Sequence, residues 1–156
     1  MTIHNTQPGA GPTLLLAEDD PDDQYLLRSA ISHLDMHLNI ICVDNGITAL
    51  EYLESALDGD GLPNLILLDL NMPMMDGKQT LQKLKGDKRF QGIPVVVYST
   101  SQSETDIEEA YSLGANSFVV KPMNFTNFTK TVQKICTYWF DTVTLRRGMH
   151  DYDRSS

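Results

Sequence analysis

The sequence is poor in three features that would narrow its function at once: cysteine, long hydrophobic runs and positive charge. It holds two cysteines, Cys42 and Cys136, both among apolar neighbours and without C-x-x-C spacing. That usage argues against a disulfide framework and favours a reducing compartment. No stretch approaches the about 20 consecutive apolar residues that span a bilayer, and no signal-peptide pattern opens the chain. We therefore expect a cytoplasmic protein without a membrane partner.

Positive charge is scarce, because 12 Lys and Arg stand against 21 Asp and Glu among 156 residues, for a formal net charge of −9. Phosphate backbones are bound by clustered Lys and Arg, so nucleic acid is not an expected partner. The acids are also concentrated, with five carboxylates in the six residues 18–23. Such a run is either solvated surface or part of a site, and its place in the fold decides which.

Short apolar runs alternate with amphipathic segments along the chain. The runs at 13–17, 39–43, 65–68, 93–98 and 117–120 are typical of strands, and about 21–34, 47–57, 78–85, 104–113 and 124–142 of helices. Pro21 favours the start of the first helix, and Gly114 the end of the fourth. Unbroken apolar runs predict a parallel sheet covered on both faces. We expect one α/β domain at 13–143 with an extended last helix, and flexible tails at 1–12 and 144–156.

In open parallel sheets, ligands gather outside the carboxyl ends of the strands. Those positions hold Glu18 and Asp19 after the first run, Asp69 after the third, Ser99 after the fourth and Lys121 after the fifth. Converging carboxylates repel one another, and a divalent cation relieves that repulsion. Hard oxygen ligands suit Mg²⁺ better than zinc. Asp69 is then a candidate nucleophile for a phosphoryl group, whose oxygens Mg²⁺, Lys121 and Ser99 would pair.

These residues stand in motifs that resemble the receiver domain of two-component response regulators. The motifs are Leu16-Ala17-Glu18-Asp19-Asp20, Asp69-Leu70-Asn71-Met72-Pro73-Met74-Met75-Asp76-Gly77, Ser99-Thr100 and Val119-Val120-Lys121-Pro122. The Asp-x-Asn-x-Pro-x-x-Asp-Gly segment, with Lys-Pro 52 residues after its first aspartate, is the most specific part. The resemblance spans roughly residues 13–140. It implies a flavodoxin-like (βα)5 fold, a doubly wound parallel sheet of five strands in the order 2-1-3-4-5.

The resemblance also implies roles for the acids. Asp69 is expected to accept the phosphoryl group. Asp19, Asp69 and the backbone carbonyl of Asn71 are expected to bind Mg²⁺, with Glu18 holding metal-bound water. The other acids of the run, Asp20, Asp22 and Asp23, are expected to stabilise the N-terminus of the first helix through its dipole.

Three further residues match the switch and the phosphate-binding group of the family. Ser99 is expected to move toward the phosphoryl group, and Phe118 to change rotamer with it. Lys121 is expected to bind the phosphate, and the Lys121–Pro122 peptide bond to be cis, which an X–Pro bond adopts at modest cost.

The resemblance implies a sensor histidine kinase or a histidine phosphotransfer protein as partner. The Glu-Asp-Asp-Pro-Asp-Asp start and the long aromatic last helix favour stand-alone receivers that serve phytochrome-type kinases. The apolar stripe of that helix reaches Trp139 and Phe140, which either fold over their own domain or pack on a second copy of the chain.

Two other functions compete with a phosphorylated receiver. One is a receiver-shaped adaptor that binds partners constitutively without phosphorylation. The other is a phosphohydrolase, which would need a carboxylate two residues after the nucleophile, where this chain has Asn71. Asn transfers no proton, so we expect no enzyme activity beyond self-phosphorylation and self-dephosphorylation.

Overall fold

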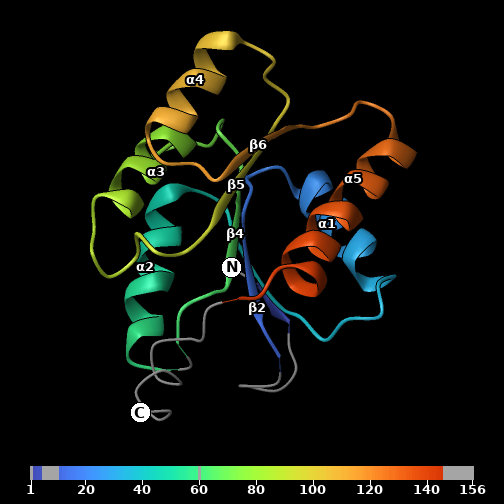
Figure 1. The fold of residues 1–156 in the computed structure, drawn as a ribbon, viewed down its shortest axis with the longest axis horizontal. Helices are drawn as coiled ribbons and strands as arrows, with labels where there is room; N and C mark the ends of the chain where they lie inside the picture. The colour runs from blue at the N-terminus through green and yellow to red at the C-terminus, as the bar shows by residue number, and fades with distance from the viewer. Residues whose placement is uncertain (1, 5–10, 60, 146–156) are drawn as a thin grey trace.

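The computed structural model describes residues 2–4, 11–59 and 61–145. They form a six-stranded sheet with helices on both faces (Figure 1). The strands are β1 Thr2–His4, β2 Thr13–Ala17, β3 Asn39–Val43, β4 Leu65–Leu68, β5 Val95–Ser99 and β6 Ser117–Val120. The helices are α1 Pro21–Ser32, α2 Gly46–Leu57, α3 Gly77–Lys85, α4 Glu104–Ser112 and α5 Phe125–Thr137, followed by the π-helix η1 Tyr138–Thr142. No helix in this described part combines the length and hydropathy that a bilayer crossing requires.

The sheet has the order β1-β3-β2-β4-β5-β6, and all pairs from β3 to β6 are parallel. Numbered along the chain without β1, the parallel strands run 2-1-3-4-5. Helices α1 and α5 lie together on one side of the sheet, and α2, α3 and α4 lie on the other (Figure 1). The predicted doubly wound fold is therefore confirmed.

The central strands are buried on both faces, because each contributes alternate residues to two separate cores. In β2, Leu14 and Leu16 belong to the core under α1 and α5, whereas Leu15 and Ala17 belong to the core under α2, α3 and α4. A strand with two apolar surroundings has no polar face. This burial explains why β2, β4 and β5 are continuous apolar runs in the sequence.

The helix boundaries follow the local signals in the sequence. Pro21 is the first residue of α1, and the Asp20 side chain caps it by accepting from the backbone N–H of Asp22 at 2.8 Å. Beyond α4 and its cap, Gly114 has φ +106°, a conformation that favours glycine. Pro21 therefore ends the loop that leaves the carboxyl end of β2, and Gly114 lies in the turn that leads from α4 into β6.

The strand expected at 93–98 is found at Val95–Ser99, and the larger differences from the prediction lie at the two ends of the chain. Residues Thr2–His4, within the expected N-terminal tail, pair with β3 in antiparallel register, and so cover backbone groups that an edge strand leaves free. The last helix was expected to run to residue 142, but its final turn is the π-helix η1. Residues 1, 5–10 and 146–156 of the expected tails lie outside the described part of the chain.

Candidate functional site

The predicted site residues lie at the carboxyl ends of neighbouring parallel strands. Glu18 and Asp19 follow β2, Asp69 follows β4, Ser99 ends β5 and Lys121 follows β6. Backbone bonds join these ends: the Asp69 N–H donates to the Ala17 carbonyl at 3.0 Å, and the Lys121 N–H donates to the Ser99 carbonyl at 2.8 Å. The sheet itself therefore brings the candidate residues to one edge.

Three carboxylates form a compact cluster at this edge. One oxygen from each of Glu18, Asp19 and Asp69 lies within 4.8 Å of the others. Glu18 and Asp69 are buried, with 3% and 8% of their surface exposed, whereas Asp19 is exposed. Oxygen donors with one side open to water suit a Mg²⁺ ion that keeps several of its waters. Asn71, the fourth predicted ligand, is exposed in the β4–α3 loop, and its carbonyl as a ligand stays a prediction.

The buried ammonium of Lys121 faces this cluster. Lys121 Nζ lies 2.6 Å from Glu18 Oε1, 2.8 Å from Asp23 Oδ2 and 3.7 Å from Asp69 Oδ2. Asp23 was predicted to serve only the helix start, and the structure adds this contact with Lys121. The sequence signal for it is slight: α1 begins at the edge where the site lies, so an acid in its first turn can face the strand ends.

Burial and mutual charge shift the pKa values of the site. Burial raises the pKa of Glu18 to about 7, with the Asp69 charge adding to the rise and the hydrogen bond from Lys121 opposing it. Burial likewise raises the pKa of Asp69, against the nearby Lys121 charge. Burial alone would lower the pKa of Lys121, but hydrogen bonds to Asp23 and Glu18 raise it above its usual value. One ammonium does not neutralise the cluster, which therefore favours binding of a cation.

A glycine fixes the loop that carries Asp69. The Gly77 N–H donates to the Leu70 carbonyl at 2.8 Å, and a Cβ added at Gly77 would lie 2.3 Å from the Asp69 backbone oxygen. Just before it, Asp76 caps α3 in a reciprocal pair with Gln79. The Asp-Gly pair of the motif thus starts a helix and lets its first turn press against the backbone of Asp69.

The two predicted switch residues lie on adjacent strands. Ser99 is fully buried, and its Oγ accepts from the Ser101 N–H at 3.1 Å. Phe118 is half-buried against the core under α2, α3 and α4, and its N–H donates to the Tyr111 hydroxyl at 3.0 Å. The prediction of a cis bond before Pro122 was wrong: that bond is trans, the isomer that X–Pro bonds favour by about 0.5–1 kcal/mol.

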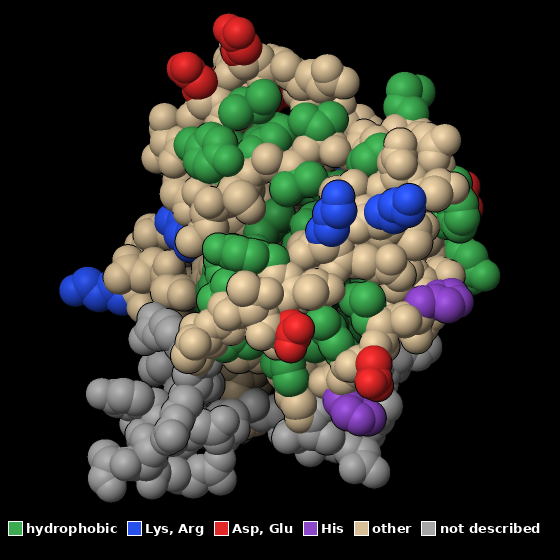
Figure 2. All heavy atoms as spheres, turned by 45° about the vertical axis from the view of Figure 1, so that its right-hand side comes forward, with side chains coloured by type: hydrophobic (Ala, Val, Ile, Leu, Met, Phe, Trp, Pro, Cys, Tyr) green, Lys and Arg blue, Asp and Glu red, His purple; other side chains and the backbone are tan. Residues whose placement is uncertain are grey.

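The predicted interface residues pack on their own domain. Trp139 and Phe140 are half-buried against the core under α1 and α5. Figure 2, which brings the side of α5 forward, shows other hydrophobic side chains at the surface. Exposed ones in the described chain include Phe125 and Tyr138. A role of Trp139 and Phe140 in self-association stays a prediction.

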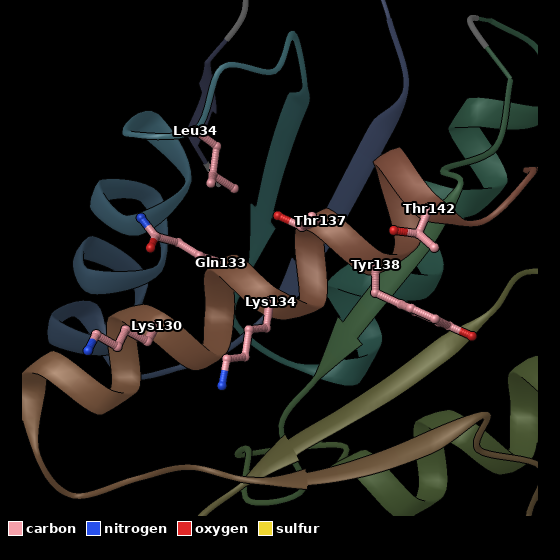
Figure 3. A pocket seen from close by; sticks show the side chains of 7 residues that line it. All are labelled: Leu34, Lys130, Gln133, Lys134, Thr137, Tyr138 and Thr142. Carbon is pink, nitrogen blue, oxygen red and sulfur yellow. The ribbon is translucent and has the colours of Figure 1, made fainter.

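A groove beside the end of α5 contains none of the predicted site residues. It has a volume of about 460 Å³ and is lined by Leu34, Lys130, Gln133, Lys134, Thr137, Tyr138 and Thr142. In Figure 3, Leu34 lies across the groove from the α5 side chains, at the end of α1. The chemistry of the acidic edge is therefore separate from this hollow.

Comparison with known proteins agrees with this geometry. Residues 14–133 match the family model described as the response regulator receiver domain. The chain is 38% identical to the probable methanogenesis regulatory protein FilR2 of Methanothrix harundinacea over 127 residues, which cover 81% of this chain and 82% of that protein. It is 35% identical to the response regulator Rcp1 of Synechocystis over 134 residues, covering 85% and 91%.

Solved structures give the same result. The crystal structure of the phosphorylated cyanobacterial phytochrome response regulator RcpA is 34% identical and has a TM-score of 0.84. The alignment covers 88% of this chain and 100% of RcpA. The Mn²⁺-bound form of Rcp1 is also 34% identical, has a TM-score of 0.82, and aligns over 87% of this chain and 99% of its own. The chain belongs to the response regulator receiver domain family.

Proposed function

We propose that this receiver accepts a phosphoryl group on Asp69 from a sensor histidine kinase or a histidine phosphotransfer protein, in a reaction that depends on Mg²⁺. One observation carries the proposal: buried Asp69 lies beside the acidic pair Glu18 and Asp19, and the ammonium of Lys121, which contacts Glu18, lies 3.7 Å from Asp69 Oδ2. Few other functions require a nucleophilic carboxylate, a cation site and a fixed positive charge within so small a space.

The metal would be held by Asp19, Asp69 and the carbonyl of Asn71, with Glu18 binding one of its waters. When bound, Mg²⁺ supplies positive charge that offsets the carboxylates and pairs with a phosphoryl oxygen. The Mn²⁺-bound form of Rcp1 supports a divalent cation in this family. In this chain, the support is the donor set itself, which is all oxygen and crowded within 4.8 Å.

The protein groups then have distinct parts in the transfer. A carboxylate oxygen of Asp69 attacks the phosphorus of the donor's phosphohistidine. The new P–O bond forms as the P–N bond breaks, and the electron pair stays on the imidazole nitrogen, which takes up a proton from water. Lys121 pairs with one equatorial oxygen and the Ser99 hydroxyl donates to another. Asn71 offers no proton, so turnover of external substrates is not part of the proposal.

Phosphorylation would change the surface through Ser99 and Phe118. In the phosphorylated state, the Ser99 hydroxyl can donate to a phosphoryl oxygen, and in the unphosphorylated state this contact does not exist. A two-state switch requires such a contact, which is made in one state and not in the other. The receiver unit, residues 13–143, would then act by binding other proteins in the cytoplasm. Nucleic acid and membrane are not among the proposed partners. A homodimer through Trp139 and Phe140 is a further element of the proposal. The phytochrome response regulator RcpA supports a phytochrome-type kinase as donor.

Intact-mass spectrometry tests the proposal. Incubation with Mg²⁺ and acetyl phosphate should add the mass of one phosphoryl group, which alkali removes. Asp69→Asn and wild-type protein in EDTA should gain none. An unlabelled wild type would contradict the proposal and favour the constitutive adaptor, whereas equal labelling of Asp69→Asn would place the acceptor elsewhere.

A further inference from the structure

Lys121 is held from α1 as well as from the strand ends. Its ammonium has three N–H groups, and the two shortest contacts are with Glu18 Oε1 at 2.6 Å and Asp23 Oδ2 at 2.8 Å. Asp69 Oδ2 lies farther away, at 3.7 Å. With two N–H groups engaged, the third is left for the space beside Asp69.

We propose that Asp23 is a positioning residue, which together with Glu18 fixes the Lys121 ammonium so that its third N–H is directed at the oxygen atoms on Asp69. This inference rests on the proposed phosphoryl transfer to Asp69. Asp23 itself touches neither the phosphoryl group nor the metal in this scheme. It acts through Lys121.

The need for such a hold follows from the lysine side chain. Lys121 carries its charge on a flexible four-carbon stem, unlike the planar fork of an arginine. Its backbone is fixed by the bond to the Ser99 carbonyl, and the Tyr98 ring centroid lies 5.9 Å from its Nζ. Neither of these contacts sets the direction of the N–H bonds. The two carboxylates do: Glu18 holds the ammonium from the end of β2, and Asp23 holds it from the first turn of α1.

Misplacing a charged group changes rates more than it changes the fold. A displacement of about 1 Å can cost about 100-fold in rate, because the charge no longer meets the transition state. Lys121 faces the phosphoryl oxygens both when Asp69 receives the group and when water removes it. Loss of Asp23 is therefore expected to slow both steps together.

Asp22 provides the matched control. It is also in the first turn of α1 and carries the same charge, but it is exposed and next to Asp23 in sequence. Any effect through the helix dipole or the net charge should appear equally in Asp22→Ala and Asp23→Ala. An effect through Lys121 should appear only in Asp23→Ala.

The experiment measures two rate constants at saturating Mg²⁺: labelling by acetyl phosphate, and loss of the label after the donor is removed. We expect Asp23→Ala to lower both by about tenfold or more, Asp22→Ala to leave both nearly unchanged, and Asp23→Glu to recover part of the loss. If Asp23→Ala fails to fold, Asp23→Asn replaces it in the comparison. Equal rates in the Asp22 and Asp23 variants would overturn the inference.

A second readout needs neither donor nor metal. With ¹⁵N-labelled protein in EDTA, the Lys121 ammonium should give a resolved, slowly exchanging signal in wild type and Asp22→Ala, and should lose it in Asp23→Ala. Retention of the signal in Asp23→Ala would overturn the inference. A wild type that keeps this signal but takes no label would overturn the proposed function, and the role of Asp23 in transfer with it.

Discussion

Replacing Asp69 by Asn should stabilise the metal-free protein, although it removes the residue on which the proposed function depends. At an effective dielectric constant of about 20, two carboxylates no more than 4.8 Å apart repel by at least about 3.5 kcal/mol, and the Lys121 charge at 3.7 Å attracts Asp69 by about 4.5 kcal/mol. Asp69 feels this repulsion from buried Glu18 in full, and from exposed Asp19 at about half because of solvent screening.

The two repulsions together slightly exceed the attraction, and the substitution also removes the cost of burying a charge. The pKa of Asp69, which burial raises, agrees with this balance, because a raised pKa means that the folded state disfavours the ionised carboxylate. We therefore expect Asp69→Asn to raise the free energy of unfolding by about 1–2 kcal/mol in EDTA at pH 8, which is about 2–4 °C in melting temperature for each kcal/mol.

Urea denaturation in EDTA and in excess Mg²⁺ measures both halves of this argument. Mg²⁺ at 100 times its dissociation constant should raise the free energy of unfolding of the wild type by about 2.7 kcal/mol. The rise should be clearly smaller in Asp69→Asn, which lacks one of the proposed metal ligands. Asp35→Asn, which removes a charge from an exposed loop, should match the wild type in both conditions. An Asp69→Asn midpoint in EDTA at or below that of the wild type would refute the electrostatic reasoning.

Three further predictions follow from single features of the fold. Gly77→Ala should lower the free energy of unfolding by about 3 kcal/mol or more in urea denaturation, because the added Cβ would lie 2.3 Å from the Asp69 backbone oxygen. Gly59→Ala, whose Cβ would lie 3.8 Å from a backbone oxygen, should lower it far less, and equal losses in the two variants would contradict the packing argument. In EDTA, burial raises the pKa of Glu18 to about 7 in the folded protein, from its usual 4.5. The stabilisation from its bound proton is therefore complete below about pH 4.5 and is lost as the pH rises through about 7. Glu18→Gln should flatten this fall in the free energy of unfolding with pH, and an unchanged slope would disprove the reasoning. Met74 has φ +66° and an exposed side chain, so Met74→Asn should raise the melting temperature by the equivalent of about 1 kcal/mol, whereas a lower melting temperature would show that its side chain matters more than its backbone.

The sequence predicted the parallel sheet well because burial on both faces leaves a local trace. Strands β2, β3 and β4 begin and end at the predicted residues, and Pro21 and Gly114 mark helix ends through their own backbone geometry. The carboxyl ends of such strands converge in any fold of this class. Glu18, Asp19 and Asp69 could therefore be placed together before their distances were known.

What the sequence did not predict depends on contacts between distant segments. Strand β1 has three residues and exists only as a partner of β3. Asp22 and Asp23 are neighbours in sequence, in the first turn of α1, so the sequence does not distinguish them. In the folded chain Asp22 is exposed, whereas Asp23 contacts Lys121, which follows β6. The apolar stripe of the last helix likewise left open whether Trp139, in η1, folds over its own domain or packs on a second copy, and the structure shows it half-buried against its own core.

The proposed role of Asp69 is tested most directly by locating the phosphoryl group on the chain. Protein treated with Mg²⁺ and acetyl phosphate is reduced with borohydride, which converts an aspartyl phosphate to homoserine, and is then analysed by peptide mass spectrometry. We predict homoserine at position 69 alone, and none when EDTA replaces Mg²⁺. Homoserine at another acidic position, or its absence from the donor-treated wild type, would contradict the assignment of Asp69 as acceptor.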